Sequence, residues 1–135
     1  MKVGVSTATF FSKLTTEDTL SVIKSIGGEC AEVFLSTYCE YEPDFATLLQ
    51  ERKSGLDIYS MHSLNTQFEP QLFNSVERTR KDAELIFNKV LATGQKLGAR
   101  VYVMHGQSRL KKSTSLNPEK VGKRLKELGD MCLDF

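Results

Sequence analysis

Apolar positions along this chain alternate between two patterns, the two-residue period of a β-strand and the three-to-four-residue spacing of an α-helix. Between residues 2 and 6 every second residue is apolar, with Val3 and Val5 on one side, which predicts a short β-strand. Thr15 then precedes acidic residues as a helix N-cap does, and apolar residues continue at the spacing of a helix as far as Gly27. The opening of the chain therefore predicts a strand followed by a helix with a defined start and end.

The same succession of strand and helix is predicted three more times. Strands are expected at residues 30–35, 56–61 and 100–104, and helices at residues 44–53, 76–97 and 118–132. The last helix follows Asn117, a capping residue, and has proline at its first position. Four successive βα units imply parallel strands joined by right-handed helical crossovers, and therefore an α/β fold.

Two α/β architectures share this order of elements. An open doubly wound sheet closes with about this many residues, whereas a TIM barrel has eight βα units and typically about 250 residues. The length of 135 residues favours the open sheet. However, the first strand-to-helix loop has neither GxGxxG nor GxxxxGK, the usual phosphate-binding signatures of such sheets. No linker or low-complexity stretch divides the chain, so residues 1–135 are expected to form one domain or part of one.

Composition and charge narrow the functional classes. Hydrophobic residues make up 40% and charged residues 26% of the chain, as in ordinary globular domains. The net charge of +1 creates no general attraction to nucleic acid or to a membrane. Three widely spaced cysteines, Cys30, Cys39 and Cys132, form neither a CxxC pair nor a disulfide framework, which indicates a reducing, cytoplasmic setting. No segment approaches the roughly 20 apolar residues of a membrane span.

The two histidines of the chain are the first candidates for chemistry. His62 and His105 each follow a predicted parallel strand, and active sites of parallel α/β folds form at the carboxyl ends of strands. By alternation His62 shares a face with Ser60 and Ile58, so both imidazoles are expected at one height and aimed at one centre. Such a pair suits a divalent metal ion, with carboxylates or water completing the shell. The alternative is that each imidazole only forms hydrogen bonds at a strand end.

Glu32 is the second candidate, because it interrupts an apolar strand. A carboxylate in the middle of a strand is costly to bury without a partner. One interpretation is a structural ion pair with Lys2, which lies on the same face of the neighbouring strand. The other is a carboxylate that faces a substrate or a metal ion.

Two loops at the same end of the sheet are long enough to contribute to a site. Residues 63–75 form an irregular stretch of the length that is usually functional or mobile. Residues 106–115 are rich in Gly, Ser and basic side chains (Arg109, Lys111 and Lys112). This second loop is either a phosphate-binding segment or simply a solvated basic loop.

At this point the sequence resembles a known family. The segments KVGVST, EVFL, YSMHSL and VYVMHG, together with QKLGAR before the fourth strand, resemble the first four βα units of xylose-isomerase-like TIM barrels. That family includes sugar-phosphate isomerases and epimerases and the apurinic endonucleases. The resemblance implies a single, partial TIM-barrel-like domain over residues 1–135, the N-terminal half of the barrel, with the open doubly wound sheet as the alternative.

The resemblance also implies what the site does. In the endonuclease branch the histidines at these strand ends bind zinc, which by position are His62 and His105. In the isomerase and epimerase branch they line the pocket, and later strands hold the divalent metal ion (Mn, Mg, Co or Zn). The leading hypothesis is half of a metal-dependent sugar or sugar-phosphate isomerase or epimerase, with Glu32 in the substrate pocket.

The alternatives are an endonuclease-like zinc phosphodiesterase and a non-catalytic half-barrel that persists by dimerisation. Without the fifth to eighth strands, metal binding is expected to be weak or absent, and the chain alone is expected to be an incomplete enzyme. Exposed sheet edges predict self-association or pairing with a second half-barrel. Neither membrane nor nucleic acid is an expected partner.

Overall fold

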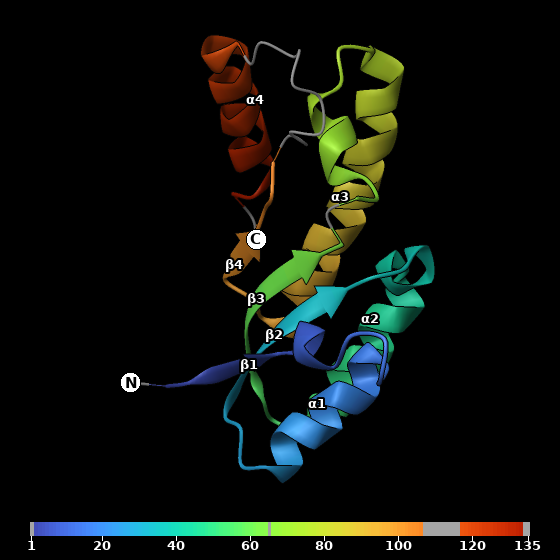
Figure 1. Ribbon diagram of the computed structural model, residues 1–135, viewed down its shortest axis with the longest axis vertical. Helices are drawn as coiled ribbons and strands as arrows, with labels where there is room; N and C mark the ends of the chain where they lie inside the picture. Colours follow the sequence, from blue (N-terminus) through green and yellow to red (C-terminus); the bar gives the residue numbers. More distant parts are fainter. Residues whose placement is uncertain (1, 65, 107–116, 134–135) are drawn as a thin grey trace.

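The computed structural model describes residues 2–64, 66–106 and 117–133, and Figure 1 shows a parallel sheet with helices packed along it. The strands are β1 (Gly4–Ser6), β2 (Cys30–Leu35), β3 (Asp57–Ser63) and β4 (Val101–Val103). The α-helices are α1 (Thr16–Ser25), α2 (Pro43–Arg52), α3 (Glu77–Leu97) and α4 (Pro118–Met131), and short 3-10 helices are η1 (Thr7–Phe10), η2 (Tyr38–Tyr41) and η3 (Glu69–Phe73).

The helix ends follow the capping signals of the sequence. The hydroxyl of Thr15 accepts a hydrogen bond from the backbone N–H of Asp18 at 3.3 Å, and the side chain of Asn117 accepts one from Lys120 at 3.1 Å. Gly98 ends α3 with φ of 79°, a left-handed conformation that a side chain would oppose. The predicted starts and ends of these helices are thus confirmed to within a few residues.

The strand order decides between the two architectures. The sheet has the order β1-β2-β3-β4, and every pairing is parallel. Right-handed crossovers that each move one strand in the same direction place consecutive helices on one face of a sheet. Figure 1 shows α1, α2 and α3 together along that face. A doubly wound sheet needs a reversal of strand order that places helices on both faces, so that alternative is wrong, and the arrangement is that of a barrel wall.

The core lies between the sheet and these helices. Residues of β2 and β3 that face the helices are essentially inaccessible to solvent, among them Val33, Leu35, Ile58 and Met61. Phe87 on α3 is also fully buried and packs against them from the helix side. Burial of this apolar face supplies the main driving force for folding the chain into this layer.

The opposite face of the sheet, here called the inner face, is open. Tyr59 on β3 and Val101 and Val103 on β4 are 50%, 38% and 39% exposed. The register between β2 and β3 shifts after Ala31, where one extra residue of β3 forms a bulge. As a result Ile58 opposes Ala31 on the helix side, whereas Ser60 opposes Glu32 on the inner face. The expectation that Ile58 shares a face with Ser60 and His62 is therefore wrong.

Several other features named in the sequence analysis can also be located in the structure. Cys30 is buried, and all three cysteines are free. No helix in the described ranges is long and apolar enough to cross a membrane. The stretch 63–75 is partly regular, because η3 forms within it. The basic loop with Arg109, Lys111 and Lys112 lies outside the described residues.

Candidate functional site

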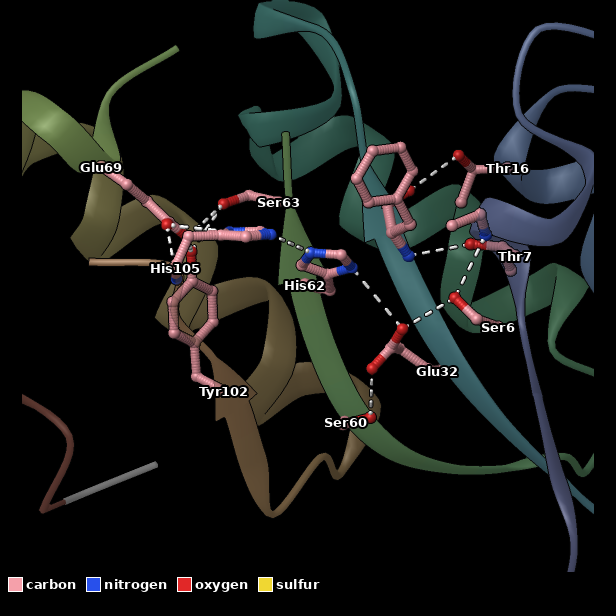
Figure 2. A network of polar contacts seen from close by, with 12 residues as sticks. Ser6, Thr7, Thr16, Glu32, Ser60, His62, Ser63, Glu69, Tyr102 and His105 are labelled. Carbon is pink, nitrogen blue, oxygen red and sulfur yellow. Dashed lines mark hydrogen bonds and ion pairs between the residues drawn. The ribbon is translucent and has the colours of Figure 1, made fainter. Parts of the chain in front are cut away.

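Polar side chains form a continuous chain across all four strands, near their carboxyl ends. Figure 2 shows this chain running from Ser6 through Glu32, His62 and His105 to Glu69. Ser6 ends β1, Glu32 lies in β2 and His62 in β3, while His105 follows β4 and Glu69 begins η3. The expectation that the imidazoles of His62 and His105 lie at one height and point to one centre agrees with this geometry, and Glu32 lies beside His62. One detail differs, since His62 lies within β3 instead of after it.

Glu32 is held by three partners on the inner face. Its Oε1 accepts a hydrogen bond from the hydroxyl of Ser6 at 2.7 Å, and its Oε2 accepts one from Ser60 at 3.1 Å. The Nδ1 atom of His62 lies 3.5 Å from Oε1. The Glu32 side chain is 25% exposed, so it can still contact a ligand on the inner face of the sheet.

The ion pair considered between Glu32 and Lys2 does not form. Lys2 instead lies 3.5 Å from Asp57, which also pairs with Arg100 at 2.9 Å. Hydrogen bonds from Arg100 hold the pKa of Asp57 below its usual range. The basic side chains Lys2 and Arg100 therefore pair with Asp57 where the strands begin. Within the described residues the Glu32 carboxylate contacts the neighbouring hydroxyls and the imidazole of His62.

The two imidazoles meet directly. Their Nε2 atoms are 3.0 Å apart, and the ring centroids are separated by 4.7 Å. Phe34 of β2 packs against His62 with ring centroids 5.0 Å apart. The side chains of His62 and His105 are 20% and 35% exposed. Both rings can therefore be reached from the inner face, and an aromatic ring packs against His62.

Glu69, which the sequence analysis missed, completes the chain of contacts. Its side chain is fully buried, and its oxygens accept hydrogen bonds from Ser63 at 3.1 Å and from Tyr102 at 2.6 Å. The backbone N–H of His105 donates to the same carboxylate at 2.9 Å, and His105 Nδ1 lies 3.1 Å away. Four contacts to one buried carboxylate satisfy the requirement that a buried charge be hydrogen-bonded.

Tyr102 donates to Glu69 because its hydroxyl stays protonated. Burial of the phenol, and next the negative charge of Glu69, raise the pKa of Tyr102 far above its ordinary value. A weak signal for Glu69 exists in the sequence, since this acid stands between the apolar residues Phe68 and Leu72. Both of these are buried, and they draw η3 with its carboxylate into the core.

A second buried carboxylate, Glu40, was also missed by the sequence analysis. It is 9% exposed and accepts hydrogen bonds from the backbone N–H groups of Ser36 and Thr37, the latter at 3.1 Å. The hydroxyl of Thr16 donates to it at 3.3 Å. Glu40 thus fixes the turn after β2 to the start of α1 and has no contact with the histidines.

The resemblance noted in the sequence implies a divalent metal ion, and the described residues fit such an ion only in part. Two Nε2 atoms at 3.0 Å can flank one ion. Glu32 and Glu69 lie on the Nδ1 sides of the rings, the position of carboxylates that orient ligating histidines, so they cannot complete the same shell. In the described part of the chain no three His, Cys, Asp or Glu side chains gather to hold a metal. Since stable sites use three or four protein ligands, these residues alone do not form one.

Comparisons with known proteins were made on sequence and on structure. No family model matches the sequence, and no curated protein matches it significantly. Among solved structures, D-psicose 3-epimerase in the presence of D-fructose is similar with a TM-score of 0.71 and 11% identity, over 99% of this chain and 49% of its own.

Two further structures give the same picture. D-psicose 3-epimerase with D-tagatose from Clostridium cellulolyticum H10 has a TM-score of 0.72 and 14% identity, over 98% of this chain and 48% of its own. A D-tagatose 3-epimerase-like protein has a TM-score of 0.74 and 17% identity, over 99% and 49% of the two chains.

The chain shares the fold of these TIM barrels. It spans about half of their length, as an N-terminal half of the xylose-isomerase-like fold does. The predicted resemblance to xylose-isomerase-like barrels is therefore confirmed for the fold. At this level of identity the comparisons do not assign a role to any residue.

Proposed function

We propose that this chain forms half of the substrate site of a sugar or sugar-phosphate isomerase or epimerase. The observation that carries the proposal is the contact chain from Glu32 through His62 to His105, at the end of the sheet where parallel folds assemble their sites. The fold shared with sugar epimerases supports a sugar as the substrate class.

In this proposal the three side chains act on hydroxyl and carbonyl groups of the sugar. Isomerisation and epimerisation move a proton next to a carbonyl, which requires groups that accept and return a proton within hydrogen-bond reach. The Glu32 carboxylate and the two imidazoles are such groups, and they face the open inner side of the sheet. They bind the sugar hydroxyls and place its reacting carbon within the half-barrel.

In this proposal the ligands of a divalent metal ion are shared between this chain and a second half-barrel. His62 and His105 contribute at most two ligands to a Mn, Mg, Co or Zn ion, and the remaining ligands come from a second half-barrel. An endonuclease-like zinc phosphodiesterase uses the same pair of imidazoles. That function needs a basic groove for the nucleic acid backbone, and the net charge of +1 offers no such excess.

Activity should depend on the complete barrel and on its inner-face residues. We expect no turnover of keto-sugars by the 135 residues alone, because half of the pocket wall is missing. When a second half-barrel completes the pocket, ketoses or their phosphates should be epimerised or isomerised. Substituting Glu32→Gln or His105→Asn should then lower the rate about 10²–10⁴-fold, measured by product analysis of the sugar.

Glu77→Gln serves as the control for these substitutions, because Glu77 lies on the outer helix α3 and is largely exposed. Its activity should equal that of the unaltered protein. Abasic DNA is assayed in parallel with the sugars. Cleavage of abasic DNA without turnover of any keto-sugar would refute the isomerase proposal in favour of the phosphodiesterase.

A non-catalytic half-barrel that persists by pairing is the second candidate, and a specific observation favours it. Strands β1 and β4 each have a neighbour on one side only within the described sheet. Beside them the inner face carries a hollow of about 550 Å³ lined by residues of β1, β2 and β3. Unpaired strand edges of this kind favour association with another sheet.

Sedimentation velocity at micromolar concentration should therefore show a dimer or a larger species. Val101→Lys places a charge on the inner face of edge strand β4 and should shift the distribution towards monomer. Leu85→Lys is the matched control, since Leu85 is 64% exposed on the outer helix α3, and it should leave the distribution unchanged. A compact, stable monomer of the unaltered chain would contradict self-association.

A further inference from the structure

Glu69 has a geometry that suggests a role beyond filling the core. It belongs to η3, outside the strands that carry Glu32 and the histidines, and it is completely inaccessible to solvent. Nothing in the packing of an apolar core requires a carboxylate at this position. A buried carboxylate costs several kcal/mol unless donors surround it, so its neighbours indicate what it is held for.

The donors around Glu69 divide between its two oxygens. Oε1 accepts from the hydroxyls of Ser63 and Tyr102, while Oε2 faces the backbone N–H and the Nδ1 atom of His105. The hydroxyls of Ser63 and Tyr102 also contact each other at 2.6 Å. The carboxylate is therefore fixed in orientation from both sides, and its Oε2 presents a lone pair to the imidazole.

We propose that Glu69 is a positioning residue that fixes His105 as the Nδ1–H tautomer. The hydroxyls of Ser63 and Tyr102 and the backbone N–H of His105 all donate to Glu69, so this side chain acts as an acceptor, and the contact of 3.1 Å places a proton on His105 Nδ1. In the neutral ring Nε2 then carries the lone pair. This lone pair points towards His62, whose Nε2 is 3.0 Å away and must donate.

The consequence is a fixed direction for the chain of contacts. His105 accepts at Nε2 and His62 donates at Nε2, so the proton between the rings belongs to His62. A ligand that enters between the rings meets an acceptor on His105 and a donor on His62. A sugar hydroxyl, which both donates and accepts, satisfies the two together. This deepens the proposed function and rests on it only for the identity of the ligand.

The tautomer can be measured directly, because the chain contains two histidines. Protein labelled with ¹⁵N in the imidazole rings is studied by long-range ¹H–¹⁵N correlation, at a pH about two units above the ordinary imidazole pKa of about 6.5. His105→Asn identifies the signals. We expect His105 Nδ1 in the protonated range and its Nε2 in the unprotonated range. The reverse pattern in the unaltered protein would overturn the proposal.

Two substitutions at Glu69 separate positioning from simple space filling. Glu69→Leu keeps an apolar core but removes the acceptor, so the protonated Nδ1 signal of His105 should be lost. Glu69→Gln keeps an acceptor oxygen towards His105 while its amide donates to the hydroxyls of Tyr102 and Ser63, so the Nδ1–H tautomer should remain. An unchanged tautomer in folded Glu69→Leu protein would refute a positioning role.

The outcome does not depend on substrate turnover or on the stability of one variant. If Glu69→Leu fails to fold, the spectra of the unaltered protein and of Glu69→Gln still decide, since each must show the Nδ1–H form of His105. Glu77→Gln on the surface of α3 is the control and should leave both rings unchanged. An Nδ1–H tautomer in a protein that epimerises no sugar would leave the inference standing and remove only the proposed function.

Discussion

Replacing Phe87 with alanine is expected to lower the free energy of unfolding by about 3–5 kcal/mol. The side chain is fully buried on α3, and its ring lies 5.1 Å from that of Tyr102 and 6.2 Å from that of Phe68, between centroids. Removing the ring leaves a cavity next to Tyr102 and Phe68. Tyr102 donates a hydrogen bond to Glu69, and Phe68 anchors the start of η3, which carries Glu69. Urea denaturation at fixed protein concentration measures the change.

Leu85→Ala is the matched control for this experiment. It is a large-to-small change on the same helix, two residues away, at a side chain that is 64% exposed. Surface substitutions usually change stability by less than about 0.5 kcal/mol. Equal losses at positions 85 and 87 would show that α3 is not packed on the sheet as described.

The second large effect concerns metal retention. We expect the 135-residue chain, after loading with zinc, to lose the metal on dialysis against a mild chelator. Two imidazoles supply two ligands, and the carboxylates of Glu32 and Glu69 lie behind the rings instead of beside the ion position. A shell completed mostly by water binds weakly, because stable zinc sites use three or four protein ligands. Atomic absorption should give far less than one zinc per chain.

His62→Ala and His105→Ala should change the retained zinc and the thermal stability little. Cys39→Ser is the control for adventitious binding, because Cys39 is an exposed free thiol and thiolates bind zinc. Stoichiometric zinc that survives dialysis, remains in Cys39→Ser and disappears on substitution of either histidine would contradict the prediction. It would show that these residues already form a complete site.

Much of the fold could be predicted from local patterns. Strand β2 has the predicted bounds, and Thr15, Gly98 and Asn117 mark helix ends as expected. These signals depend on residues within a few positions of each other, where hydrogen bonds of caps and turns are decided. The closeness of His62 and His105 was predictable for the same kind of reason, since equivalent ends of consecutive parallel strands lie side by side.

Other features depended on contacts between distant residues. The β-bulge at Tyr59 moved Ile58 to the helix side, because pairing with β2 and burial against the helices outweighed simple alternation along β3. Lys2 pairs with Asp57 instead of Glu32 because the registers of β1 with β2 and of β2 with β3 align Gly4, Cys30 and Asp57, close to Lys2.

The sequence by itself determined the α/β class, the four βα units and the meeting of His62 and His105 at neighbouring strand ends. Tertiary structure alone decided that the strand order is sequential, which makes a barrel wall, and that Glu69 enters the site. The donors to Glu69 stand six to 36 residues away along the chain, on β3, on β4 and just after β4. A loop carboxylate is polar and normally solvated, so only the packed arrangement of those donors could offset the cost of burying it.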